Sequence, residues 1–178
     1  MSAAQVRMVF YHLDRMELRL CQTLNHAGRR RWVHEVFATV SRLGDGMFWY
    51  LLILFLAATQ GRVGRTAAGH MGLVAAANVV LYTFIKHRLA RERPFVSHTG
   101  IARGAPAMDR FSFPSGHTLH AVAFSVIGLS YFPDLAWILV PFVALTALSR
   151  IVLGLHYPSD VVAGALLGLA LAYLSFHI

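Results

Sequence analysis

Five long apolar runs, separated by polar stretches, constrain this chain more than any other feature. They lie near residues 32–59, 66–85, 115–132, 135–149 and 160–176. Helices of roughly 15 to 20 residues, rising about 1.5 Å per residue, match a hydrocarbon core about 30 Å thick. With 57% hydrophobic and 13% charged residues, the composition is not that of a soluble globule. We expect an all-α integral membrane protein with about five transmembrane helices, forming a single membrane-embedded domain over residues 1–178.

An amphipathic helix is predicted ahead of the first span, from about Ala4 to Leu24. Apolar positions such as Phe10 and Leu13 recur at helical spacing, and charges such as Asp14 interrupt them. Such a helix lies in the headgroup region or against the bundle; the alternative is a short cytosolic helix. The first 20 residues lack the unbroken apolar core of a cleaved signal peptide.

The charge balance points to phosphate or lipid headgroups as partners. Lys and Arg number 16 against 8 Asp and Glu, and every basic residue except Lys86 is an arginine. The arginines border apolar spans, which favours anionic lipid and a phosphorylated substrate over nucleic acid. Their planar donor forks match phosphate oxygens. A single cysteine, Cys21, excludes an intramolecular disulfide and a multi-cysteine metal site.

Several polar residues fall within the predicted spans. Arg42 and Asp45 interrupt the first span, and we expect them on a face turned toward protein. A polar loop is predicted at Gln60–Arg65. His70 and Asn78, in the second span, are expected to form hydrogen bonds between helices.

The order of the spans places three polar stretches on one membrane face. The ends of the second and fourth spans and the starts of the third and fifth fall on the same side, so 86–117 and 150–160 share it. The N-terminal helix lies there too. Since 86–113 is longer than an ordinary connection, we expect it to be functional.

Each stretch carries groups suited to an anion. Lys86 and Arg93 lie about two helical turns apart, and Pro94 is expected to end that helix. Ser115 is a natural N-cap, and Gly116 allows a ligand to approach the free N–H groups of a helix start. His117 lies in that first turn. Taken singly, these stretches are also explained by membrane-edge anchors and ordinary capping.

The most specific stretch joins the fourth and fifth spans. It contains Arg150, His156 and Asp160, with Ser159 expected to be the N-cap of the fifth helix. Asp160 can accept a hydrogen bond from one imidazole nitrogen of His156, so that the other nitrogen faces the substrate as a nucleophile. A local hydrogen bond without function is the plainer interpretation of this pair.

Together the three stretches suit phosphoryl transfer, in which catalysis is mainly positioning and charge stabilisation. The predicted phosphate-binding groups are Lys86, Arg93, Ser115, Gly116 and Arg150, and the predicted catalytic groups are His156, His117 and Asp160. His156 would attack phosphorus, while His117 would protonate the leaving alkoxide and then activate water. No carboxylate cluster is evident for a divalent metal, so we expect no metal and no cofactor.

Lys86-x6-Arg93-Pro94, Pro114-Ser115-Gly116-His117 and Ser149-Arg150-x5-His156-x3-Asp160 together resemble, in order and spacing, the three-part motif of the type 2 phosphatidic acid phosphatase superfamily. The motif core covers 86–160, and every motif position is filled. The resemblance implies an α-helical membrane enzyme that dephosphorylates lipid phosphates without metal. The small size is similar to bacterial members acting on phosphatidylglycerol phosphate, phosphatidic acid or undecaprenyl pyrophosphate.

Other functions remain open at this point. A phosphotransferase could pass the phosphoryl group from one lipid to another through the same site, and a non-enzymatic lipid-binding protein would release no phosphate. Vanadium-dependent haloperoxidases share the phosphate cage but are larger and soluble. The resemblance implies a bacterial inner membrane with the site facing the periplasm, whereas the positive-inside rule taken literally places it in the cytoplasm.

Overall fold

The computed structural model describes residues 3–177, apart from the side chains of residues 3, 4, 6 and 7, and within them it contains helices and no strands. The all-α prediction is confirmed. In chain order the elements are α1 (Ala3–Ala27), α2 (Arg31–Arg42), the π-helical segment η1 (Leu43–Met47), α3 (Phe48–Thr59), α4 (Gly61–Leu89), α5 (Pro94–Ser97), α6 (Gly116–Tyr131), the 3₁₀ turn η2 (Pro133–Leu135), α7 (Ala136–Val152) and α8 (Pro158–Ser175).

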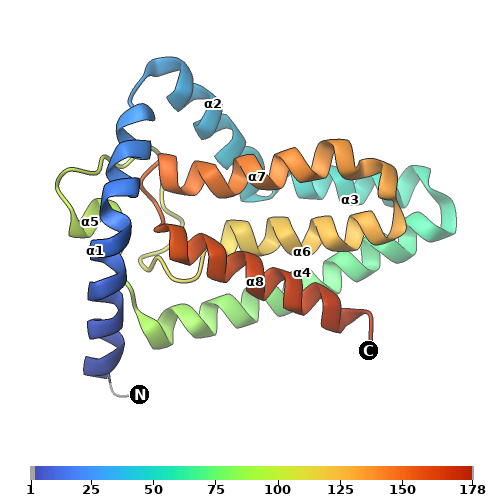
Figure 1. Cartoon of the computed structure of the whole chain (residues 1–178). Coiled ribbons are helices and arrows are strands. Elements are labelled where there is room, and N and C mark those ends of the chain that lie inside the picture. Colours follow the sequence, from blue (N-terminus) through green and yellow to red (C-terminus); the bar gives the residue numbers. More distant parts are fainter. Residues whose placement is uncertain (1–2, 178) are drawn as a thin grey trace.

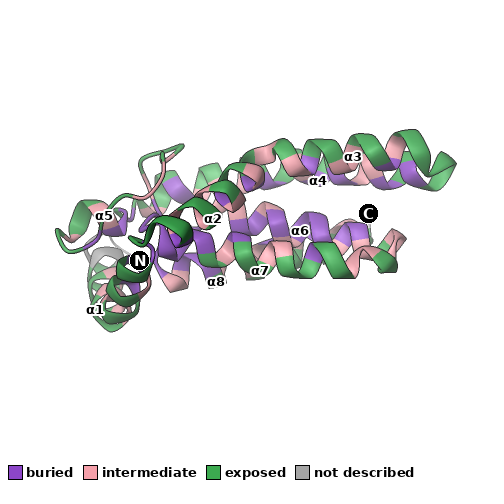
Figure 2. Ribbon diagram, turned by 90° about the horizontal axis from the view of Figure 1, so that it is seen from above, coloured by how far each residue is buried: buried purple, intermediate pink, exposed green. Residues whose placement is uncertain are grey.

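Four helical segments in the described part of the chain are long and apolar enough to cross a membrane. They are Arg31–Thr59, Gly61–Ser97, Pro133–Val152 and Pro158–Ser175. The fifth predicted span is α6, which has 16 residues and runs alongside the others in the middle of the bundle (Figure 1). Its residues are largely buried, whereas the paired helices α3 and α4 expose much of their surface (Figure 2). Between the polar ends of α3 and α4 this exposed surface is largely apolar, as contact with lipid chains requires.

Close contact between α6 and α8 fixes the start of both helices. A Cβ atom added at Gly164 of α8 would lie 2.5 Å from the carbonyl oxygen of Ser115, so only glycine allows this approach. The amide of Ser115 donates to the carbonyl of Asp160 at 3.0 Å. Two of the predicted functional stretches are therefore joined through backbone contacts.

Helix α1 crosses the end of the bundle at which α5 and the loop between α5 and α6 lie (Figure 1). The Asn25 amide nitrogen donates to the carbonyls of Ala102, at 2.8 Å, and Val152, at 3.0 Å. Apolar side chains of α1 such as Met16 and Tyr11 point outward. The helix thus packs against the bundle, as predicted, and exposes apolar side chains together with basic ones such as Arg15 and Arg19.

Two predictions about the second span are wrong. The Gln60–Arg65 segment is not a loop, since α4 already begins at Gly61. Gln60 and Gly61 complete the turn from α3, and Arg62 and Arg65 point outward from helical positions. His70 does join helices, through Tyr131 at 3.2 Å and Ser175 at 2.7 Å. Asn78 is fully buried, but no polar group of the described residues reaches its amide.

Candidate active site

The ends of α4, α6 and α7, together with η1 and the loop before α6, surround one cavity of about 760 Å³. Six of the predicted site residues line it: Lys86, Arg93, Gly116, His117, Arg150 and His156. Ser115 and Asp160 are fully buried behind its wall. The three polar stretches therefore meet, as their order along the chain predicted.

Lys86 and Arg93 are not held on one continuous helix, contrary to the sequence prediction. Helix α4 ends at Leu89, where Ala90 adopts left-handed geometry, and Pro94 begins α5 rather than ending the preceding helix. The two cations meet instead through the loop residue Asp109. The Lys86 Nζ atom donates to Asp109 Oδ2 at 2.6 Å, and Arg93 Nη2 donates to Asp109 Oδ1 at 2.8 Å.

Asp109 was not identified from the sequence, although it pairs with two of the cations of the cage. Its burial acts to raise the pKa of the carboxyl, but the hydrogen bonds and charges of Lys86 and Arg93 outweigh this effect and lower the pKa. Its side chain keeps 39% of its surface exposed. The ionised and accessible carboxylate of Asp109 thus occupies the position between Lys86 and Arg93 that an anionic group of a ligand would take.

Arg150 is the third cation of the cage and is 1% exposed. Its Nη1 donates to the hydroxyl of Ser41 on α2 at 2.5 Å. Its Nε, also buried, has no partner among the described residues. Because an unpaired buried donor is unfavourable, this N–H is available to an oxygen of a ligand in the cavity.

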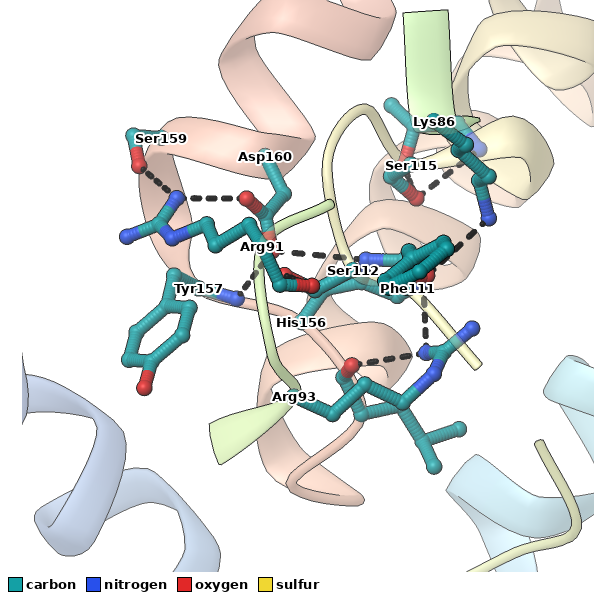
Figure 3. Close-up of polar contacts among 12 residues, drawn as sticks. Lys86, Arg91, Arg93, Phe111, Ser112, Ser115, His156, Tyr157, Ser159 and Asp160 are labelled. Carbon is teal, nitrogen blue, oxygen red and sulfur yellow. Dashed lines mark hydrogen bonds and ion pairs between the residues drawn. The ribbon is translucent and has the colours of Figure 1, made fainter. Parts of the chain in front are cut away.

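The nucleophilic nitrogen predicted for His156 faces the cations. Arg93 Nη1 donates to His156 Nε2 at 3.1 Å (Figure 3), so Nε2 carries the lone pair and Nδ1 carries the proton. Burial, followed by the charges of Arg93 and Arg150, lowers the pKa of His156 well below its ordinary value. A neutral imidazole whose Nε2 carries no proton is the form that can attack phosphorus.

Asp160 approaches His156 without forming the predicted hydrogen bond. The distance from Asp160 Oδ2 to His156 Nδ1 is 3.4 Å, and Nδ1 has no hydrogen bond within the described chain. The carboxylate is instead held by the Tyr157 amide at 2.9 Å and by Arg91 Nη1 at 2.5 Å (Figure 3). These two donors hold the Asp160 carboxylate slightly too far from His156 Nδ1 for a hydrogen bond. The carboxylate still faces Nδ1, the nitrogen that carries the proton.

Arg91 is the second residue that the sequence reasoning missed. Its guanidinium joins Asp160 to Asp14 of α1, at 2.6 Å, and to the hydroxyl of Ser159, at 2.7 Å. Ser159 is consequently not the N-cap of α8: Tyr157 takes that position, and the serine binds Arg91 and Glu17. The position of Arg91 between Lys86 and Arg93 was the one hint in the sequence that it belongs to the site. The partners of Arg91 lie far away in the sequence.

The start of α6 follows the predicted capping. Ser115 Oγ accepts from the amide of Thr118 at 3.5 Å and lies 3.0 Å from the Thr118 hydroxyl. Because Ser115 is fully buried, its structural contact is this cap, and a direct contact with phosphate remains a prediction. His117 reaches the cavity, and its Nε2 contacts the carboxylate of Asp45 from η1.

The cage is positively charged and contains no recognisable metal site. Among residues 3–177 there is no group of three or more His, Cys, Asp or Glu side chains that could hold a metal ion. The cavity is instead faced by three cations, two histidines and the N-terminus of α6. This set of donors suits a tetrahedral dianion.

Residues 67–178 match the family model described as the PAP2 superfamily. The undecaprenyl-diphosphatase BcrC of Bacillus subtilis is 36% identical over 127 residues, which cover 71% of this chain and 64% of that protein. Phosphatidylglycerophosphatase B of the same organism is 31% identical over 160 residues, covering 82% and 75%. The match to the first of these spans slightly less than two thirds of that relative's length.

The arrangement of helices is also found in a solved structure. The crystal structure of Aquifex aeolicus LpxE superposes with a TM-score of 0.79 at 25% identity, covering 92% of this chain and 96% of that one. The likeness therefore extends beyond the matched region to α1 and the first span.

Proposed function

The chain belongs to the PAP2 superfamily, and we propose that it removes a phosphate group from a phosphorylated membrane lipid. The observation that carries this proposal is the meeting of Lys86, Arg93 and Arg150 with two histidines on one cavity. Phosphoryl transfer requires little covalent chemistry from the protein beyond a nucleophile, a proton donor and stabilisation of the phosphoryl oxygens. This cavity offers each of these groups.

In the first step, His156 Nε2 attacks phosphorus and forms an N–P bond while the bond from phosphorus to the lipid oxygen breaks. The leaving oxygen takes a proton from His117. The lowered pKa of His156 keeps Nε2 unprotonated, and the proton on Nδ1 faces Asp160, which stabilises the positive charge that develops on the ring. Arg93 Nη1 donates a hydrogen bond to Nε2 before substrate binds, and it donates to a phosphoryl oxygen when Nε2 attacks.

In the second step, water hydrolyses the phosphohistidine. His117, left neutral, accepts a proton from the attacking water, and the electron pair of the N–P bond returns to Nε2. Lys86, Arg93 and Arg150 hold the three equatorial oxygens in both steps, assisted by the amide of Gly116 at the helix start. These side chains neutralise the charge, so we propose metal-independent hydrolysis.

The substrate class follows from the rest of the cavity. Beyond the cage its wall continues along α3, α4 and α6 with apolar side chains that include Trp49, Ile53, Val79 and Phe124. A lipid whose phosphate enters the cage would place its chain along this wall. The names of two relatives support phosphatidylglycerol phosphate or undecaprenyl pyrophosphate as the substrate, and the resemblance of the motifs adds phosphatidic acid as a third candidate.

The test is release of inorganic phosphate by the purified protein from a panel of lipid phosphates and isoprenyl pyrophosphates. We expect release from at least one, and no release by His156→Ala. Thin-layer separation of radiolabelled products distinguishes hydrolysis from transfer to a second lipid. Absence of release from every member of the panel would refute the proposal.

We further propose that the protein lies in a bacterial inner membrane with the cage facing the periplasm. Labelling of Thr99→Cys in intact cells by a membrane-impermeant maleimide tests this orientation. Thr99 is exposed and lies in the segment between Lys86 and His117, two residues that line the cavity, and the native Cys21 is buried and gives little background. Labelling only after permeabilisation would place the cage in the cytoplasm.

A further inference from the structure

The first membrane span contributes a carboxylate to the cage. Asp45 lines the cavity and contacts His117 Nε2, although it lies 72 residues earlier in the chain and outside the segment that matches the family model. An ionisable residue inside a span is unfavourable unless it is paired or functional. Its pairing with the proposed proton donor gives this residue a specific task.

The local backbone is built to present this carboxylate. Asp45 lies in η1, the kink between α2 and α3, directly before the residue at which the backbone leaves helical geometry. Gly46 has a φ of 142°, which side-chain-bearing residues rarely adopt, so the sequence Gly-Asp-Gly permits a break that a regular helix would not contain. The break turns Asp45 toward the first turn of α6.

The contact also determines which nitrogen of His117 meets the substrate. Nε2 is occupied by Asp45, and Nδ1 has no hydrogen bond within the described chain. The other charged groups near this ring are cations, Arg150 from α7 and Lys86 from α4, with His156 across the cavity. Asp45 is the carboxylate that contacts this ring, and its negative charge acts against theirs.

We propose that Asp45 is a positioning residue that orients His117 and stabilises its protonated form, so that Nδ1 donates to the leaving oxygen. This inference rests on the proposed function. In the first step the Nδ1 proton passes to the oxygen released from phosphorus, and the Nε2 proton remains on the hydrogen bond to Asp45. In the second step Nδ1 takes a proton from water, which restores the starting state.

The test compares two phosphate monoesters with the same hydrocarbon chain, one an alkyl ester and one a nitrophenyl ester. An alkoxide needs a proton as it leaves, whereas a nitrophenolate does not. Asp45→Asn should lower kcat/KM for the alkyl ester by about 10²-fold, and for the nitrophenyl ester by less than about 5-fold. Because kcat/KM covers only the steps up to departure of the alcohol, hydrolysis of the phosphohistidine does not enter the comparison.

Two further variants separate positioning from structure. In a His117→Ala background, Asp45→Asn should cause no additional loss, since the group through which it acts is gone. Asp45→Glu keeps the carboxylate and should preserve the wild-type ratio between the two esters, which provides a readout if the asparagine variant does not fold. Asp134→Asn, an exposed acid in η2, is the matched control and should match the wild type.

Equal losses on both esters, or an additional loss in the His117→Ala background, would overturn the inference and leave the proposed function standing. A glutamate variant whose ester ratio departs from the wild type as strongly as that of the asparagine variant would overturn it too. If the wild-type protein hydrolyses neither ester nor any lipid phosphate, the proposed function fails, and the role of Asp45 fails with it.

Discussion

Replacing Arg91 with methionine should strongly destabilise the protein, because it leaves the carboxylate of Asp160 buried without its cation. The side chains of Arg91 and Asp160 are 1% and 0% exposed. Removing one partner of a buried ion pair costs about 3–5 kcal/mol, because the other charge stays buried and uncompensated. For a chain of this length, about 2–4 °C per kcal/mol gives a fall in melting temperature of roughly 6–20 °C.

The single cysteine provides the assay. Cys21 of α1 is 1% exposed, and burial, reinforced by the carboxylates of Glu17 and Asp160, raises the pKa of its thiol to about 12. A thiol in this state does not react with a maleimide dye until it is exposed. Labelling of Cys21 during heating in detergent therefore reports the release of α1 from the bundle, and tryptophan fluorescence reports the core around Trp49.

Two comparisons make the result specific. Arg88→Met, on the exposed side of α4, should change the stability by no more than about 0.5 kcal/mol. Adding Asp160→Asn to Arg91→Met removes the orphaned charge and should recover part of the lost stability. A melting temperature for Arg91→Met within the range of the Arg88→Met control would refute the role assigned to this ion pair.

Further changes test the groups of the cage. His156→Ala should reduce phosphate release to background, on the order of 10⁴-fold or more, and Asp160→Asn should cost less, about 10²-fold; wild-type activity of His156→Ala would disprove the nucleophile. Asp109→Asn should strengthen inhibition by vanadate about tenfold, because a charge-assisted competitor for Lys86 and Arg93 is lost; unchanged or weaker inhibition would contradict this. Because the pKa of His156 is lowered on folding, the contribution of this residue to the free energy of unfolding falls as the pH drops below about 6.5, by up to about 1.4 kcal/mol per pH unit. Over this pH range His156→Gln should therefore lose less stability than the wild type, as followed by tryptophan fluorescence. EDTA should leave activity unchanged, and strict magnesium dependence would contradict metal-independent hydrolysis.

Much of this molecule was predictable from local patterns. The apolar runs gave the five-helix bundle, and their alternation across the membrane placed Lys86, His117 and His156 on one face. Ser115 was recognisable as a helix cap because capping depends on neighbours three residues away. The order of the spans therefore predicted which stretches meet, whereas several predictions from adjacent residues, including the cap at Ser159 and the helix end at Pro94, were wrong.

The residues that were missed are those whose partners lie far away in the sequence. Arg91 pairs with Asp14 and Asp160, 77 and 69 residues away, and Asp45 pairs with His117 across 72 residues. A sequence shows that such groups are charged but not which side chain opposes them. The error at Ser159 has the same origin, because its hydroxyl serves Arg91 and Glu17 instead of capping its own helix.

The acidic partners of the cage differ in how firmly the fold holds them, and this difference assigns them separate effects on catalysis. Asp160 is fully buried and fixed by Arg91 and by the Tyr157 amide, so it can act only on His156. Asp109 and Asp45 keep 39% and 44% of their side-chain surfaces exposed. Asp109 satisfies the cations that a phosphate would bind, whereas Asp45 contacts the group that would donate a proton to the leaving oxygen. Neutralising Asp109 should therefore strengthen anion binding, and neutralising Asp45 should slow departure of the alcohol. Opposite outcomes from these two Asp→Asn changes would separate the binding role of Asp109 from the proton-transfer role of Asp45. A general loss of cavity shape could not produce opposite outcomes.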